Sequence, residues 1–147
     1  MCLFSSIVKG IVMRTVLLVL LFSAASVTYA QGYTIQRPGQ MPTYATPNAG
    51  GGYTIQRPGQ MPSYVTPNGG GSTIQRPGRM PSYVTPNPGG GSTIQTPGEM
   101  PTYVTPNAGG GYTIQHPGQM PSYVTPNGGG GYMIQTPGEM PTYINRN

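Results

Sequence analysis

Apolar and polar residues recur along this chain with a period of about 20 residues, a length found both in solenoids and in low-complexity arrays. Each copy opens with a block such as Tyr-Thr-Ile-Gln at 33–36. The β-branched and aromatic residues of this block are typical of a short strand. The block Met-Pro-Thr-Tyr-Ala-Thr-Pro-Asn at 41–48 follows, with valine in place of alanine in the next four copies. Its prolines favour an extended backbone but remove donors, so we expect an edge strand or an unpaired segment.

The two blocks of each copy are separated by a Pro-Gly pair. In Arg37-Pro38-Gly39-Gln40, proline suits the second turn position and glycine suits the positive φ of the third. We therefore predict a type II turn here. Each complete copy ends in asparagine followed by a glycine-rich tail, which we interpret as a flexible joint. Six copies follow one another, at 33–52, 53–71, 72–91, 92–111, 112–131 and 132–147.

Residues 1–30 differ in composition from the repeats. Lys9 and Arg14 precede an apolar run of 13 residues, 15–27, and the segment ends in Thr28-Tyr29-Ala30. This order is typical of a secretory signal peptide, which we expect to form a helix and to be cleaved after Ala30. The run is shorter than the roughly 20 residues of a membrane-spanning helix, so we expect no stable membrane anchor after cleavage. Met13 is an alternative start.

Cleavage would remove Cys2, the only cysteine of the chain. Disulfides and thiolate chemistry are then excluded from the repeats.

The composition of the repeats predicts little fixed structure. Glycine and proline supply 41 of the 117 residues after Ala30, while leucine, phenylalanine and tryptophan are absent there. Such a chain is usually low-complexity or disordered. One copy cannot bury enough apolar surface to offset the entropy of ordering its residues. We therefore expect a mostly disordered array with short extended segments and type II turns. The alternative is a β-solenoid or β-meander of six stacked repeats.

The inventory of side chains argues against an enzyme. The repeats contain one histidine and no aspartate, lysine or cysteine, and their two glutamates lie 40 positions apart, at Glu99 and Glu139. Catalytic dyads and triads therefore lack members. Seven methionines are soft ligands in principle, but single thioethers about 20 residues apart do not make a preformed Cu(I) site. We expect no metal and no cofactor.

Charge is concentrated at the two positions that flank each Pro-Gly pair. These residues are Arg37/Gln40, Arg57/Gln60, Arg76/Arg79, Thr96/Glu99, His116/Gln119 and Thr136/Glu139. We interpret both positions as solvated, with side chains close together across the turn. The alternative is that the basic first half of the array docks on an anionic surface. Nucleic acid is not an expected partner of an exported chain without lysine.

Tyrosine is the most regular candidate for a functional contact. It offers an apolar ring and a hydroxyl, which suit sugar stacking and self-association. The chain generally resembles small exported tandem-repeat proteins of bacterial envelopes. We predict a non-enzymatic structural or interaction protein of the periplasm or cell surface that acts through weak multivalent contacts with itself, peptidoglycan or a polysaccharide. The alternative is a folded β-solenoid that binds a glycan or protein. The candidate contacts are Tyr33, Tyr44, Tyr53, Tyr64, Tyr83, Tyr103, Tyr112, Tyr123, Tyr132 and Tyr143.

Overall fold

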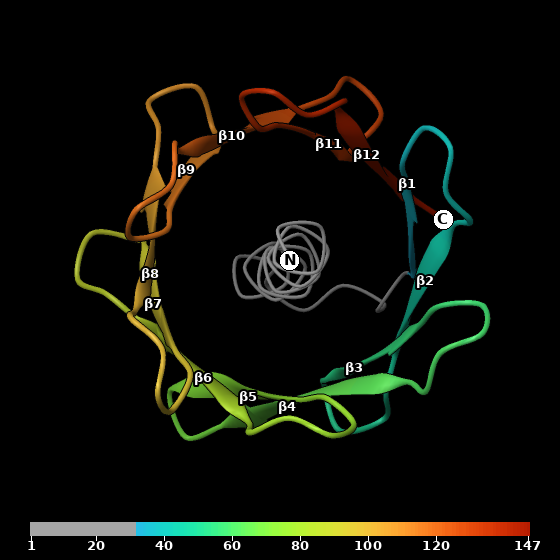
Figure 1. Ribbon diagram of the computed structural model, residues 1–147, viewed down its shortest axis with the longest axis vertical. Helices are drawn as coiled ribbons and strands as arrows, with labels where there is room; N and C mark the ends of the chain where they lie inside the picture. Colours follow the sequence, from blue (N-terminus) through green and yellow to red (C-terminus); the bar gives the residue numbers. More distant parts are fainter. Residues whose placement is uncertain (1–31) are drawn as a thin grey trace, which may run out of the picture.

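The repeats form a closed antiparallel β-barrel of twelve strands. The computed structural model describes residues 32–147, so the predicted signal helix and cleavage site lie outside the described residues. Figure 1 shows the strands following one another around a ring, with the first and last side by side. The strands are β1 (Tyr33–Gln36), β2 (Thr43–Pro47), β3 (Tyr53–Gln56), β4 (Ser63–Asn68), β5 (Gly71–Gln75), β6 (Ser82–Pro86), β7 (Ser92–Gln95), β8 (Thr102–Pro106), β9 (Tyr112–Gln115), β10 (Ser122–Pro126), β11 (Tyr132–Gln135) and β12 (Thr142–Arg146).

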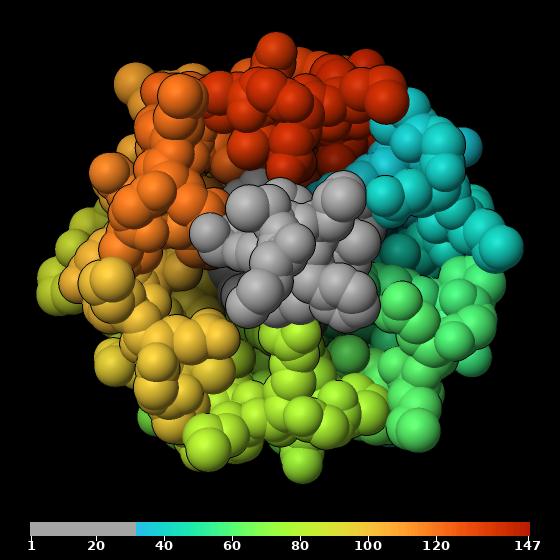
Figure 2. All heavy atoms as spheres, in the orientation of Figure 1, coloured from blue at the N-terminus to red at the C-terminus, as the bar shows by residue number. Residues whose placement is uncertain are grey.

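The expectation of a disordered array is wrong, and the β-solenoid alternative is wrong as well. Each copy contributes one antiparallel hairpin, and every strand pairs with a neighbour on both sides. The β-meander alternative fits in part, because the strands do follow one another in sequence order. The prediction from composition fails because it considers the apolar content of one copy. In the closed ring, backbone groups of neighbouring copies form hydrogen bonds with each other and no sheet edge remains. Figure 2 shows the six copies as successive sectors around the ring.

The contacts between copies are made by a belt of aliphatic side chains inside the barrel. In the register of the sheet, Val65 lies opposite Ile74 of the next copy, and Val84 lies opposite Ile94. Both members of each pair are buried. Directly opposed side chains of this kind are the basic stabilising unit of an antiparallel sheet. The belt consists of Ile35, Ala45, Ile55, Val65, Ile74, Val84, Ile94, Val104, Ile114, Val124, Ile134 and Ile144.

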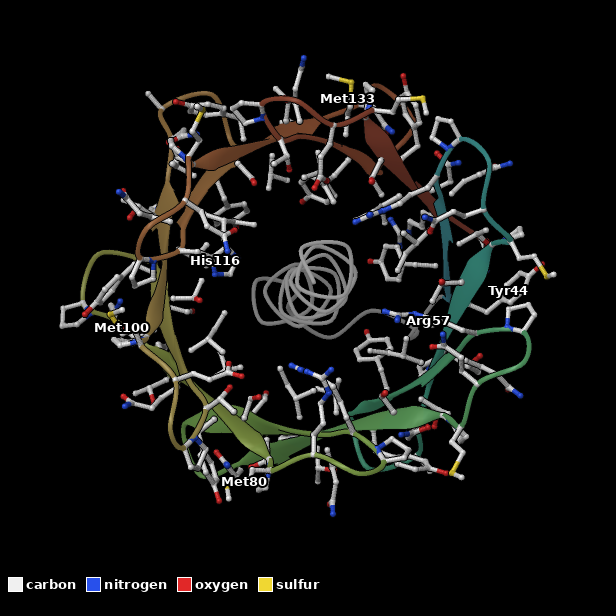
Figure 3. All side chains as sticks on the ribbon, in the orientation of Figure 1. Tyr44, Arg57, Met80, Met100, His116 and Met133 are labelled. Carbon is white, nitrogen blue, oxygen red and sulfur yellow. The ribbon has the colours of Figure 1, made fainter. Side chains whose placement is uncertain are left out.

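Alternation along each strand assigns the remaining side chains to the two faces of the barrel wall. Tyr44 lies on the outer face, whereas Arg57 and His116 point into the barrel (Figure 3). Residues one position away from the aliphatic belt therefore face outward, and residues two positions away face inward. The two faces consequently present different chemistry. Threonine, glutamine and six of the tyrosines lie outside, whereas aliphatic, hydroxyl-bearing and basic side chains lie inside with the other four tyrosines.

The Pro-Gly turns have the conformation that the sequence predicts. Gly39 has φ of +73°, and the Gln40 amide donates to the Arg37 carbonyl at 3.2 Å. The strand predicted at 33–36 is also confirmed, as β1. The second block is not an unpaired segment, because β2 pairs with both β1 and β3. Its final residue, Pro47, pairs only toward β3, so the missing donor lies where β2 locally has a single neighbour.

The glycine tails are ordered turns, and their interpretation as flexible joints is wrong. In the first tail the Gly51 amide donates to the Asn48 carbonyl, and the Asn48 amide donates to the Gly52 carbonyl. Gly51 has φ of +82°, a region that side chains rarely adopt. The last glycine of each tail approaches a neighbouring strand so closely that a Cβ would collide with a backbone carbonyl oxygen. The shorter second copy is accommodated by a tight turn, with Asn68 opposite Gly71.

The barrel is closed by β1 and β12, which come from the first and last copies. Ile35 lies opposite Ile144, and Thr34 lies opposite Asn145. The terminal Asn147 amide donates to the Gly32 carbonyl at 3.0 Å, and its side chain accepts from the Thr34 hydroxyl at 2.8 Å. The same asparagine–threonine bond joins successive copies elsewhere, as in Thr113 to Asn107 at 3.0 Å. The junction between the chain ends therefore repeats the junctions inside the chain.

Substitution of the last glycine in a tail tests this close packing. Gly131→Ala would place a Cβ against the carbonyl oxygen of Ile144, whereas Gly128→Ala meets nothing within 4 Å and has alanine counterparts at Ala49 and Ala108. We expect Gly131→Ala to lower the free energy of unfolding by about 2–3 kcal/mol, and Gly128→Ala to change it by less than about 0.5 kcal/mol, in urea titrations. Equal effects of the two substitutions would contradict the described turn.

Candidate functional site

The structure divides the ten candidate tyrosines into two sets. Six lie on the outer face and are 42–48% exposed: Tyr44, Tyr64, Tyr83, Tyr103, Tyr123 and Tyr143. The other four face inward and pack against the aliphatic belt: Tyr33, Tyr53, Tyr112 and Tyr132. The repeat period identifies both tyrosine positions. Only the structure shows that the side chains at one position point out of the barrel and those at the other point into it. The ten residues therefore do not form one functional surface.

Each outer tyrosine lies opposite a glutamine of the following copy. Tyr44 pairs with Gln56 across β2 and β3, and Tyr143 pairs with Gln36 where the barrel closes. The same pairing occurs at Tyr64 with Gln75, at Tyr83 with Gln95, at Tyr103 with Gln115 and at Tyr123 with Gln135. Directly opposed side chains in a sheet lie about 5 Å apart at Cβ. An aromatic ring and a carboxamide are thus adjacent at six places around the barrel.

Two of these pairs border a groove below the next Pro-Gly turn. One groove, of about 500 Å³, is lined by Tyr44, Gln56, Pro58, Gly59, Gln60 and Met61, together with Arg57. The equivalent groove at the closure, of about 660 Å³, is lined by Tyr143, Gln36, Pro38, Gly39, Gln40 and Met41, together with Arg37 and Asn145. The same tyrosine, glutamine and methionine recur at the equivalent positions of all six copies, and we call these six places on the outer face the outer grooves.

The methionines add apolar surface to the outer grooves. The methionine that follows each Pro-Gly turn is 63–76% exposed in all six copies. Figure 3 shows Met80 and Met100 on the outside of the wall, away from each other. Exposed thioethers in a line of grooves suit an adaptable apolar contact with a ligand. The sequence shows these methionines as single thioethers about 20 residues apart, but it does not place them beside the tyrosines of the preceding copies.

The inner tyrosines occupy a continuous arc of the wall and leave a gap. Tyr112, Tyr132, Tyr33 and Tyr53 come from consecutive copies around the ring, and their proximity is reflected in the raised pKa of Tyr132, where burial is the first cause and Tyr112 and Tyr33 add to it. Burial, with Tyr33 adding to it, likewise raises the pKa of Tyr53. The third and fourth copies have Ser72 and Ser92 at this position.

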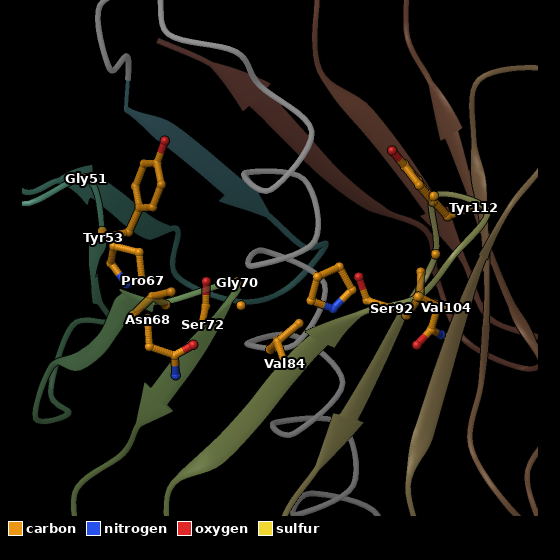
Figure 4. Close-up of a pocket in the computed structure, with 17 residues that line it drawn as sticks. Gly51, Tyr53, Pro67, Asn68, Gly70, Ser72, Val84, Ser92, Val104 and Tyr112 are labelled. Carbon is orange, nitrogen blue, oxygen red and sulfur yellow. The ribbon is translucent and has the colours of Figure 1, made fainter.

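A cavity of about 610 Å³ occupies this gap in the arc of tyrosines. Its ends are marked by Tyr53 and Tyr112, and its wall includes Ser72, Ser92 and Val84 (Figure 4). The serine side chains are too short to fill the space that tyrosines occupy in the other four copies. The sequence does show the exchange of tyrosine for serine. The exchange alone does not predict a cavity, however, because the sequence does not show that this position faces into the barrel.

The first of the two positions flanking each Pro-Gly turn also faces inward, which corrects the interpretation of both positions as solvated. Arg76 is only 7% exposed, whereas Arg79 of the same turn is exposed. His116 points into the barrel (Figure 3) and shares a 2.6 Å hydrogen bond with the Thr102 hydroxyl through Nδ1. Burial lowers the pKa of His116, with an opposing effect from Glu99. The two positions therefore differ in exposure, most clearly at the turn of the third copy, where Arg76 is buried and Arg79 is exposed.

Comparisons of the chain with family models, curated proteins and solved structures give no match. Within residues 32–147, no three histidine, cysteine, aspartate or glutamate side chains gather as metal ligands. The same part of the chain contains no helix long and apolar enough to cross a membrane.

Filling the serine gap provides a test of the inner arc. Ser72→Tyr would restore the residue found in four other copies and extend the arc into the cavity, and we expect it to raise the free energy of unfolding by about 1 kcal/mol through added apolar burial. Ser82→Tyr is the matched control, because Ser82 is fully buried and bonded to Thr96 at 2.8 Å, so overpacking should destabilise it. Urea unfolding of both variants measures the difference. Destabilisation by Ser72→Tyr as large as that by Ser82→Tyr would contradict the cavity.

Proposed function

We propose that the protein is an exported, non-enzymatic binding module that holds a neutral glycan polymer of the bacterial cell envelope in its outer grooves. The observation that carries this proposal is the sixfold repetition of one tyrosine–glutamine pair on the outer face. Export is inferred from residues 1–30, whose charge and apolar pattern is typical of a signal peptide.

The chemistry of one groove suits a sugar ring. A half-exposed tyrosine such as Tyr44 presents an aromatic face for the apolar C–H face of a sugar, and its hydroxyl remains available for hydrogen bonding. The opposed Gln56 carries a carboxamide, which both donates and accepts hydrogen bonds and so matches sugar hydroxyls. Pro58 and Met61 supply the apolar border. Such a shallow site binds one sugar unit weakly.

Repetition compensates for weak single sites. The grooves are carried on paired strands of a closed sheet, so their mutual positions are fixed rather than set by a flexible linker. A polymer that occupies one groove presents its next units to the adjacent groove at high effective concentration. A repeating ligand therefore gains far more from this surface than a single sugar does.

Charge variation at the groove rims favours a neutral polymer. The exposed residue after each Pro-Gly pair is a glutamine at Gln40, Gln60 and Gln119, an arginine at Arg79, and a glutamate at Glu99 and Glu139. An anionic polymer would be repelled by the two glutamates, and a cationic one by the arginine. A neutral chain meets no repulsion in any of the six grooves.

Progressive removal of the outer tyrosines tests the proposal. We expect Tyr103→Ala to weaken co-sedimentation with insoluble cellulose, a neutral glycan, by less than about threefold. Replacement of Tyr64, Tyr103 and Tyr143 by alanine should weaken it by about tenfold or more, and replacement of all six outer tyrosines should abolish it. Thr85→Ala, on the same outer face, is the control and should bind as the parent does.

Two results would contradict multivalent glycan binding. Undiminished sedimentation of the sixfold variant would show that the outer grooves are not the binding surface, and complete loss with Tyr103→Ala alone would indicate a single site. Sedimentation velocity without glycan tests whether the outer grooves instead mediate self-association of barrels. A parent that self-associates, and a sixfold variant that does not, would assign the grooves to contacts between barrels instead.

A further inference from the structure

The inner face of the barrel carries three arginines at equivalent positions of consecutive copies. Arg37, Arg57 and Arg76 each follow the last residue of an odd-numbered strand, β1, β3 and β5, and lie near the Pro-Gly turns. One intervening strand separates neighbours, so their Cα atoms are about 10 Å apart. Arg37 and Arg57 line one void of about 10 Å³ together with Thr43. The long side chains are thus neighbours on one side of the interior.

Arg76 is buried, Arg37 and Arg57 are partly buried, and none of the three is fully hydrogen-bonded. The Nε atoms of Arg37, Arg57 and Arg76 are buried and lack a partner. Arg76 makes a 3.4 Å contact from Nη2 to the Ser82 hydroxyl, which is a weak hydrogen bond. Arginine carries five N–H donors, so most of its capacity remains available for another acceptor. The two glutamates of the described chain lie on exposed turns rather than inside.

The electrostatics of the three arginines are mutually unfavourable. Burial lowers the pKa of Arg37 to about 10, with Glu139 opposing this effect and Arg57 adding to it. Burial also lowers the pKa of Arg57. The pKa of Arg76 is lowered by burial first and by Arg79 next, with Glu99 opposing and Arg57 adding to the decrease. All three guanidinium groups are still protonated at neutral pH, so positive charge accumulates on one side of the interior.

The other three copies show that the barrel does not need arginine here. Thr96 shares a 2.8 Å hydrogen bond with Ser82, Thr136 shares a 2.9 Å hydrogen bond with Ser122, and His116 bonds to Thr102. These residues are uncharged or, in the case of His116, have a lowered pKa. A threonine therefore satisfies this position at smaller desolvation cost than a buried arginine does. Structural stability alone does not account for the three arginines.

We propose that Arg37, Arg57 and Arg76 form a binding site for an anion with phosphate or sulfate groups inside the barrel. The planar guanidinium group matches tetrahedral oxyanions through paired N–H donors, and an anion would supply the missing acceptors. Thr43 and Ser82 add hydroxyls beside Arg37 and Arg76. The spacing of three arginines along the wall favours a ligand with two or more charged groups. Arg57, between the other two, contacts the centre of such a ligand.

Arg57 points into the barrel whereas Tyr44 lies on the outer face (Figure 3), although Arg37 and Arg57 also line two of the outer grooves. A different class of ligand therefore tests this inference separately from glycan binding. The test is isothermal titration of the purified protein at low ionic strength with inorganic pyrophosphate, phosphate and sulfate, and with acetate as a monovalent carboxylate control. We expect pyrophosphate to bind most tightly, phosphate and sulfate more weakly, and acetate not at all. Pyrophosphate should also raise the melting temperature of the parent protein.

Variants of one turn distinguish anion binding at an inner site from nonspecific attraction of anions to positive surface charge. Arg76→Thr copies the residue found in the fourth and sixth copies, and should weaken pyrophosphate binding by about tenfold or more. Arg57→Thr should have at least as large an effect. Arg79→Gln removes an exposed charge only three residues from Arg76 and should change the affinity by less than about twofold. A preference of the parent for sulfate over phosphate would assign the site to sulfate-bearing ligands.

Two results would overturn the proposal. One is the absence of measurable binding by all three oxyanions at millimolar concentration, with a parent protein that melts cooperatively. The other is an equal loss of affinity in Arg79→Gln and Arg76→Thr, which would show that pyrophosphate responds to surface charge. The thermal melts of the variants without anion verify that each barrel is folded.

Discussion

Antiparallel pairing around a complete ring is the constraint on which this structure depends. A copy of about 20 residues rich in glycine and proline has too little apolar surface to fold alone. In the barrel, Val65, Val84 and their equivalents contact isoleucines of the next copy rather than of their own. The first and last copies are joined in the same manner, with Ile35 opposite Ile144 and Asn147 bonded to Gly32 and Thr34. Stability is therefore a property of the six copies together.

The closed ring also gives each repeated position a fixed side of the wall. A tyrosine one residue from the aliphatic belt, such as Tyr44, faces outward, whereas Tyr33 two residues from the belt faces inward. Because the copies repeat around the barrel, each side-chain position recurs as a circle of equivalent residues on one face of the wall. The outer ring of tyrosine, glutamine and methionine is nearly uniform, as a surface for a repeating ligand requires. The inner rings vary, with serines at Ser72 and Ser92 and arginines in the first three copies.

Local structure could be predicted from the sequence, but its assembly could not. The strand at 33–36 and the type II turn at Arg37–Gln40 follow from intrinsic preferences of the residues and are both present. Ring closure depends on contacts between residues more than a hundred positions apart, which composition does not report. Gly52 shows the difference: the sequence predicts a flexible tail, yet a Cβ at Gly52 would collide with the Val65 carbonyl oxygen. Close approach of backbones selects glycine as strongly as flexibility does.

The candidate site was predictable to the same extent. The repeat period identifies all ten tyrosines, and the structure shows that six of them border the outer grooves. The sequence shows the three arginines as charged residues beside turns and predicts that they are solvated. The inward direction of Arg37 follows only once Ile35, two residues earlier, is known to face into the barrel. Charge at a turn is usually solvated, so no local signal distinguishes Arg76 from Arg79.

Ring closure can be measured through one pair of methyl groups. Ile35 and Ile144 are the one directly opposed isoleucine pair in the strand register of residues 32–147, because the other isoleucines lie opposite valine, alanine, serine or threonine. A nuclear Overhauser spectrum of protein labelled at the isoleucine δ1 methyl groups should therefore contain a strong cross-peak between Ile35 and Ile144. Absence of this cross-peak, in a sample whose hairpins show their own cross-strand contacts, would contradict the closed barrel and indicate an open array of repeats.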